Sequence, residues 1–148
     1  MREAIGSSFV LNFIITFIII FILIFVGTLT YTKAYKVKNK IVDTIEYYDG
    51  KVTNGNRLNS DVQTEIDKKL KTIGYRIDNE NSNCSSDGRI KGTAISKNNT
   101  GYRYCIYKNT TDRGDYYEVV AYAYLEIPII GAKLEFPVYG ETKIFMDI

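Results

Sequence analysis

The sequence predicts an α+β protein: a long N-terminal transmembrane helix that continues into a stalk, followed by a small domain with one short helix and an antiparallel sheet. Three observations predict this class. An uninterrupted apolar run fills residues 9–29, a helical apolar pattern continues beyond it, and β-rich alternating segments fill the C-terminal third. Helices followed by a run of strands are typical of α+β domains.

The apolar run, FVLNFIITFIIIFILIFVGTL at residues 9–29, carries no charge. A helix needs roughly 20 apolar residues to cross a ~30 Å hydrocarbon core, and this one is apolar on every side. A buried core helix fits less well, because small domains rarely bury a helix that is hydrophobic all round. A cleaved signal peptide is the stronger alternative, although its apolar region is usually ~7–15 residues long. We expect a single-pass membrane protein with residues 1–8 as a short tail.

The helical pattern continues beyond the apolar run, and Asp49-Gly50 supplies a turn that ends it. One helix from about Ser8 to Tyr48 would be about 60 Å long, with residues 30–49 as a juxtamembrane stalk. Lysines separate the apolar residues of the stalk, which recur three or four positions apart: Ala34, Val37, Ile41, Ile45 and Tyr48. This apolar stripe needs a cover, either from the downstream domain or from a neighbouring subunit.

Residues 50–148 form the predicted domain, which begins with a polar connector at 51–59 and a second helix. Ser60 and Gln63 have the spacing of a capping box, and Gly74 stands at the C-terminal stop. One face of this helix is apolar: Val62, Ile66, Leu70 and Ile73.

The remainder reads as an antiparallel sheet. Residues 75–77 begin a strand, 78–86 are a loop, 102–108 alternate as a strand, and 109–115 hold turn residues. The last segment runs from 134 to 145, and Pro137 inside it indicates a sheet edge or a break.

Residues 116–127 are the strongest predicted strand. One face carries Tyr117, Val119, Ala121, Ala123, Leu125 and Ile127, and the other carries Glu118, Tyr122, Tyr124 and Glu126. Because Ala121 and Ala123 are small, they would let a helix approach the first face closely.

The chain has two cysteines, Cys84 and Cys105, and no histidine, so the cysteines cannot complete a zinc site within it. A disulfide between them would close a loop of about 20 residues and contribute about 3 kcal/mol. Two unrelated thiols are the alternative, because spacing alone does not establish bridging distance.

The composition favours a non-enzymatic protein without metal or cofactor. Glu118 and Glu126 lie about 26 Å apart along one strand, so they are expected to be charges on a solvated face. The acidic residues Asp78, Glu80 and Asp87 lack the spacing of a calcium loop. A net charge of +2 provides no field for nucleic acid, and no small-molecule substrate is expected.

Two blocks of the sequence resemble pilin-like proteins, and more particularly TadE-like pilus-assembly proteins. Residues 2–43 combine Gly6-Ser7-Ser8, the membrane helix and its extension. Residues 119–148 combine a strand, an apolar loop with Pro and Gly, and a closing strand with Gly140 and Thr142 in a G-x-T pattern. There is one departure. Pilin-like leaders are cut after a Gly and carry Glu five residues later, where a cut after Gly6 would place Leu11.

The resemblance implies a minor pilin, pseudopilin or TadE-like accessory subunit of a bacterial envelope assembly. Its partners would be the lipid bilayer and other pilin-like membrane subunits. Its N-terminus would be cytoplasmic and its domain extracytoplasmic, an orientation that a Cys84–Cys105 bridge would also favour. The positive-inside rule favours the reverse, because Arg2 precedes the span and four lysines follow it: Lys33, Lys36, Lys38 and Lys40.

Two functional hypotheses follow. In the assembly hypothesis the long helix packs against the domain and against partner helices, through the residues Val37, Ile41, Ile45, Tyr48, Ala121 and Ala123. In the alternative, the helix is only an anchor, and the Tyr-rich sheet recognises a glycan, peptide or small ligand. Lys38 is expected on the exposed face of the stalk.

Overall fold

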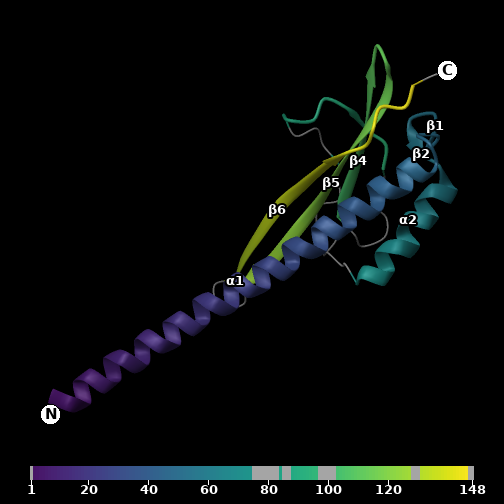
Figure 1. Cartoon of the computed structure of the whole chain (residues 1–148). Helices are drawn as coiled ribbons and strands as arrows, with labels where there is room; N and C mark the ends of the chain where they lie inside the picture. The colour runs from purple at the N-terminus through teal and green to yellow at the C-terminus, as the bar shows by residue number, and fades with distance from the viewer. Residues whose placement is uncertain (1, 75–83, 85–87, 97–102, 128–130, 147–148) are drawn as a thin grey trace.

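The computed structural model describes residues 2–74, 84, 88–96, 103–127 and 131–146. Its elements are α1 (Arg2–Tyr47), β1 (Thr53–Asn54), β2 (Arg57–Leu58), α2 (Ser60–Ile73), β3 (Thr93–Ala94), β4 (Tyr104–Thr111), β5 (Gly114–Ile127) and β6 (Ala132–Glu141). This is the predicted α+β architecture. The N-terminal half of α1 projects away from the described remainder of the chain, which gathers around its C-terminal half (Figure 1).

The stop of α1 lies where the sequence predicts it. Asp49 and Gly50 both have positive φ, 49° and 72°, and the Gly50 N–H donates to the Ile45 carbonyl over 3.2 Å. Such a left-handed ending provides partners for the last helical carbonyls. Glycine is also needed for space, because a Cβ at Gly50 would lie 2.4 Å from Cγ of Phe145.

Helix α2 confirms the predicted apolar face and stop, but it begins differently. Val62, Ile66 and Leu70 are buried, and Gly74 adopts the left-handed conformation at φ 65°. The N-cap is Asn59 and not Ser60, because Asn59 has the extended backbone of a cap and its side chain accepts from the Asp61 N–H. The segment before it is also more than a polar connector, since β1 and β2 pair there.

Strands β3 to β6 form one antiparallel sheet in sequence order. The ladder between β4 and β5 continues to the pair Thr111–Gly114, so the turn consists of residues 112–113 alone. The predicted turn at 109–115 is therefore too long. Cross-strand side-chain bonds keep its flanks in the ladder: Asn109 donates to Glu118 and Thr110 donates to Asp115, each over 2.7 Å.

Strand β6 is an edge strand, as its proline predicts, and Pro137 pairs with Tyr122 of β5. The strand ends at Glu141 and does not extend to Phe145 as predicted. Phe145 instead forms an isolated bridge with Asp115, in which each N–H donates to the other residue's carbonyl. The predicted strand at 75–77, the residues 78–83 and 85–86 of the predicted loop, and residues 128–130 lie outside the described residues.

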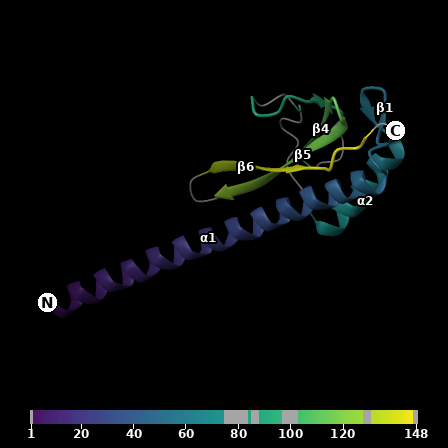
Figure 2. The same ribbon diagram turned by 45° about the horizontal axis from the view of Figure 1, so that its top comes forward.

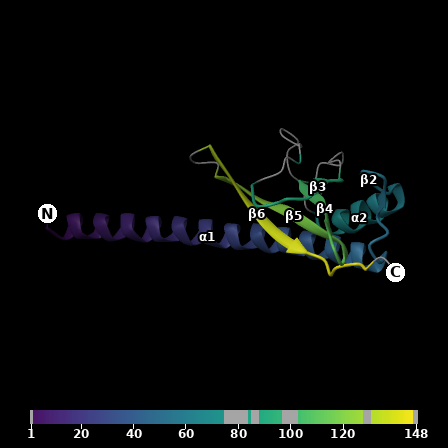
Figure 3. The same ribbon diagram turned by 90° about the horizontal axis from the view of Figure 1, so that it is seen from above.

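The sheet and α2 both pack along the C-terminal half of α1 (Figures 2 and 3). Side chains from these elements form one main core cluster, which includes Val37, Ile41 and Ile45 of α1. A smaller cluster lies on the opposite face of the sheet and contains Ile90, Cys105, Tyr107 and Val120. The sheet is therefore covered by apolar packing on both faces over part of its area.

Cys84 and Cys105 form a disulfide in the structure, with their Cα atoms 5.6 Å apart. The bond joins a half-buried residue before β3 to a buried position of β4 within the smaller cluster. It thereby ties Cys84 to the face of the sheet that α1 does not cover.

Replacing both Cys84 and Cys105 with Ala should lower the free energy of unfolding of the domain by about 3 kcal/mol, because the unfolded chain regains the entropy of the open loop. Chemical denaturation of the purified protein, with and without reductant, measures this loss. The reduced natural protein should match the variant, and the variant should not respond to reductant. Equal unfolding midpoints under oxidising conditions would contradict the prediction.

Candidate functional site

The N-terminal half of α1 presents an apolar surface along residues 9–29, which we call the apolar half. Every residue in it is exposed or partly exposed, with Phe17 at 64% and Phe21 at 63%. The helix is long and apolar enough to cross a membrane, judged by length and composition. Its threonine hydroxyls bond back to the helix, for example Thr28 to the Ile24 carbonyl over 2.9 Å. Such bonds leave few polar groups unsatisfied in an apolar solvent.

The C-terminal half of α1 has the opposite character, because its apolar stripe is completely buried. Ala34, Val37, Ile41 and Ile45 each have 0% exposure. They join the core cluster with residues of α2, β5 and β6, and α1 contacts all three of these elements. The downstream domain of the same chain therefore provides the cover that the sequence requires.

The sheet meets this stripe through small side chains. Ala121 and Ala123 of β5 are 0% and 2% exposed, and Val138 of β6 lies in the same cluster. We call these three residues and the buried stripe of α1 the helix–sheet seam. The sequence does not indicate Val138, because the adjacent proline reads as a break, whereas the edge position of β6 accommodates it.

Gly140 marks the closest approach of β6 to α1. A Cβ at Gly140 would fall 2.3 Å from Cδ of Lys38, so the lysine stem lies directly on the strand. Lys38 is half-buried, and its ammonium stands 4.2 Å from the ring centroid of Tyr35. The expectation that Lys38 occupies the exposed face is wrong, because lysine stems readily cover apolar surface while the charge stays in water.

Hydrogen bonds tie the end of α1, which the half-buried Tyr48 directly follows, to β5 and to the C-terminal segment. The Tyr117 hydroxyl donates to the Gly50 carbonyl over 2.8 Å, and the Lys143 N–H donates to Glu46 over 3.1 Å. Thr142 exchanges two bonds with the backbone of Tyr117. The sequence singles out two of these residues, Gly50 as a helix stop and Thr142 in the G-x-T pattern. It does not predict the contacts themselves, because they join residues far apart in the chain.

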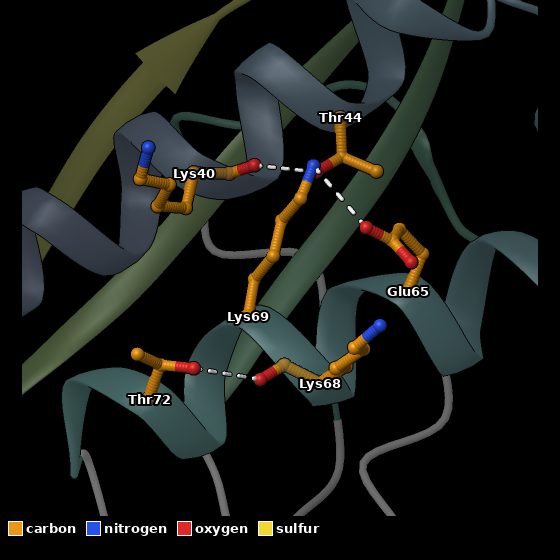
Figure 4. Close-up of polar contacts among 6 residues, drawn as sticks. All are labelled: Lys40, Thr44, Glu65, Lys68, Lys69 and Thr72. Atoms are coloured by element: carbon orange, nitrogen blue, oxygen red, sulfur yellow. Dashed lines mark hydrogen bonds and ion pairs between the residues drawn. The ribbon is translucent and has the colours of Figure 1, made fainter.

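A polar contact accompanies the packing of α2 on α1. Lys69 of α2 donates to the hydroxyl of Thr44 over 3.1 Å and lies 3.7 Å from Glu65 (Figure 4). Thr44 is fully buried, and its hydroxyl in turn donates to the Lys40 carbonyl over 2.7 Å. The buried hydroxyl therefore has both a donor and an acceptor, which avoids the cost of an unsatisfied polar group.

Helix α2 also contacts β4 through a buried tyrosine. Gln63 donates to the hydroxyl of Tyr104, which is 1% exposed. Burial raises the pKa of Tyr104 well above its ordinary value, so the phenol stays neutral at physiological pH. The contact is suited to holding the two elements together.

The tyrosines of the sheet are largely engaged in packing. Tyr107 and Tyr117 are each 1% exposed, and Arg103 lies over the ring of Tyr122 at 4.6 Å while pairing with Glu135 at 2.7 Å. Among the described residues, no group of three His, Cys, Asp or Glu side chains could hold a metal ion. Glu118 is half-buried, while Asp78, Glu80 and Asp87 lie outside the described residues.

No family model, curated protein or solved structure matches this chain. The likeness to TadE-like and pilin-like proteins therefore stays a prediction from two blocks of sequence. In the structure, α1 is a single helix whose first half is apolar and uncovered and whose second half is buried against the domain of the same chain.

The variant Ile41→Asp should destabilise the domain by about 3 kcal/mol or more, because it places a carboxylate among apolar side chains at a fully buried position. The matched control is Lys40→Asp, which introduces the same residue at the preceding position, which is exposed. It should change stability by less than about 0.5 kcal/mol. Thermal unfolding of both variants measures the difference. Equal melting temperatures would contradict a packed seam.

Proposed function

We propose that this protein is a single-pass, membrane-anchored, non-enzymatic subunit of a bacterial pilus-like (Tad/type IV-like) envelope assembly. The observation that best supports this proposal is that the two halves of one 46-residue helix lie in different surroundings. Its apolar half offers a surface to lipid and to other membrane helices, and its second half is the central element of a small domain. Anything that positions the helix in the membrane therefore positions the domain as well.

Contacts with partner subunits are assigned to the apolar half. The helix–sheet seam is buried within the chain, so its side chains hold the domain on the helix and leave residues 9–29 for lateral packing. In lipid, helices associate through shape and dispersion rather than through the hydrophobic effect. The Phe and Ile side chains that cover every side of this helix provide such surfaces.

We assign the domain to the extracytoplasmic side. The disulfide between Cys84 and Cys105 supports this side, since such bonds persist in oxidising compartments. The lysines after the span favour the reverse by the positive-inside rule, and Lys33, Lys36 and Lys40 are exposed. We give the disulfide more weight, because a charge bias can be overridden, whereas a reducing compartment would keep the two thiols reduced and unbonded.

The tethered binding module receives no specific support among the described residues. The central tyrosines of the sheet are buried, and Tyr122 is stacked under Arg103. A Tyr-rich receptor surface would present several tyrosine rings to solvent, whereas Tyr139 is the only exposed tyrosine among those described in the sheet, at 36%. The assembly function is therefore the one we put to the test.

The topology of the protein is the first test. Protease added to intact protoplasts should remove the domain after residue 48 and leave a membrane-embedded fragment, because α1 crosses the bilayer once. Gel analysis and mass measurement identify that fragment, and an intact cytoplasmic marker shows that the cells were closed. A domain cleaved only after lysis would contradict the orientation. If the mass of the untreated mature protein shows that residues 9–29 have been removed, the segment is a cleaved signal peptide instead.

The assembly contacts are the second test. A photoreactive amino acid at Phe17 should form adducts with other membrane proteins on irradiation of living cells, because this side chain is 64% exposed in the apolar half. The matched control is the same substitution at Tyr47, which is 81% exposed at the far end of the helix. Mass spectrometry identifies the partners. Lipid adducts alone at Phe17 would point to a simple anchor and favour the binding module.

A further inference from the structure

The hairpin of β5 and β6 runs along α1 toward its apolar half. Strand β5 begins near the end of α1, where Tyr117 reaches Gly50, and it continues in the opposite direction to the helix. Strand β6 returns from the hairpin end to Gly140, which lies against Lys38. Figure 3 shows the paired ends of β5 and β6, which we call the hairpin end, at the level of the middle of α1 and diverging from the helix.

Strand and helix geometry shows how far the hairpin reaches. Phe136 and Leu134 precede Gly140 by four and six residues, about 13 and 20 Å along a strand. The same lengths correspond to about 9 and 13 residues of helix. Because β6 diverges from α1 (Figure 3), these counts are upper limits: measured from Lys38, Phe136 reaches no farther than the level of about residue 29 of α1, and Leu134 no farther than about residue 25. Residues 25–29 are the last turns of the apolar half, so the hairpin end extends toward the C-terminal end of that half.

The side chains at this level are apolar and uncovered. Leu134 and Phe136 share a strand face with the buried Val138, yet they are 41% and 51% exposed. They lose the cover of α1 because the hairpin end and the helix diverge there. In the last turns of the apolar half of α1, Val26 and Leu29 are 40% and 50% exposed. Apolar side chains are therefore exposed on two elements, the hairpin end and the last turns of the apolar half.

Two tyrosines follow the apolar half of α1 on its C-terminal side. Tyr31 and Tyr35 follow the apolar half on α1 and are 53% and 47% exposed, with the exposed Lys33 and Lys36 beside them. Tyrosines with adjacent lysines are typical of the boundary between lipid and water. The hairpin end extends from Gly140, which lies against Lys38, toward this boundary.

From these observations we propose that the end of the β5–β6 hairpin inserts its apolar face, with Leu134 and Phe136, into the lipid surface of the leaflet from which α1 emerges. The proposal rests on the membrane anchoring of α1 proposed above. The insertion is shallow. The ladder pairs β5 with β6 as far as Ile127 and Ala132, but the outer edge of β6 still needs hydrogen bonds. The hydrated headgroup region can supply those bonds, whereas the hydrocarbon core cannot.

A single tryptophan tests the insertion, because the chain contains none. The full-length variant Phe136→Trp is reconstituted in phosphatidylcholine vesicles whose acyl chains are brominated either near the headgroup or near the chain end. Its emission should be quenched, and more strongly by the shallow bromines. Tyr47→Trp, at the far end of α1, is the matched exposed control and should keep its emission. Phe21→Trp reports separately whether α1 itself lies in lipid.

The outcomes separate the insertion from the anchoring on which it rests. Quenching at Phe21→Trp without quenching at Phe136→Trp would overturn the insertion and leave the membrane anchor standing. A blue-shifted but unquenched Phe136→Trp would mean that protein, such as a second copy of the chain, covers the hairpin, which also overturns it. An unquenched Phe21→Trp would remove the anchor and the insertion together. If Phe136→Trp unfolds at a lower temperature than the natural protein, Leu134→Trp takes its place.

Discussion

Removal of one apolar stripe from water organises this molecule. Each large side chain of the stripe on the C-terminal half of α1 would forgo roughly 1.5–3 kcal/mol if it stayed in water. Val37, Ile41 and Ile45 are completely buried, and the sheet and α2 are the elements that bury them. The small Ala121 and Ala123 let β5 come close enough to do so. The domain is thus built around the helix rather than attached to its end.

This arrangement couples the apolar half of α1 mechanically to the domain. The same helix continues from the apolar half into the seam without a break, and hydrogen bonds from Tyr117 and Lys143 hold its end. A lateral contact in the membrane would therefore orient the domain directly, which suits a structural subunit. The disulfide lies on the opposite face of the sheet, where it stabilises the part that α1 does not cover.

Local signals in the sequence determined much of the fold. The apolar run and the spacing of three and four residues after it identify a single long helix, because both depend only on helical periodicity. Gly50 and Gly74 identify the two helix ends, since a left-handed residue is commonly supplied by glycine. Pro137 indicates either an edge strand or a break, because it lacks the N–H that an inner strand requires, and the structure shows the edge strand.

Contacts between distant parts of the chain decided what the sequence alone left open. Whether the stripe is covered by its own domain or by a neighbour depends on the path of the chain, and so does the pairing of Cys84 with Cys105. Lys38 reads as an exposed residue of the stalk, but the approach of Gly140 turns it into part of the packing. The bridge between Phe145 and Asp115 joins residues 30 positions apart. Periodicity and turn chemistry act over a few residues, whereas these contacts arise only when the whole domain closes on α1.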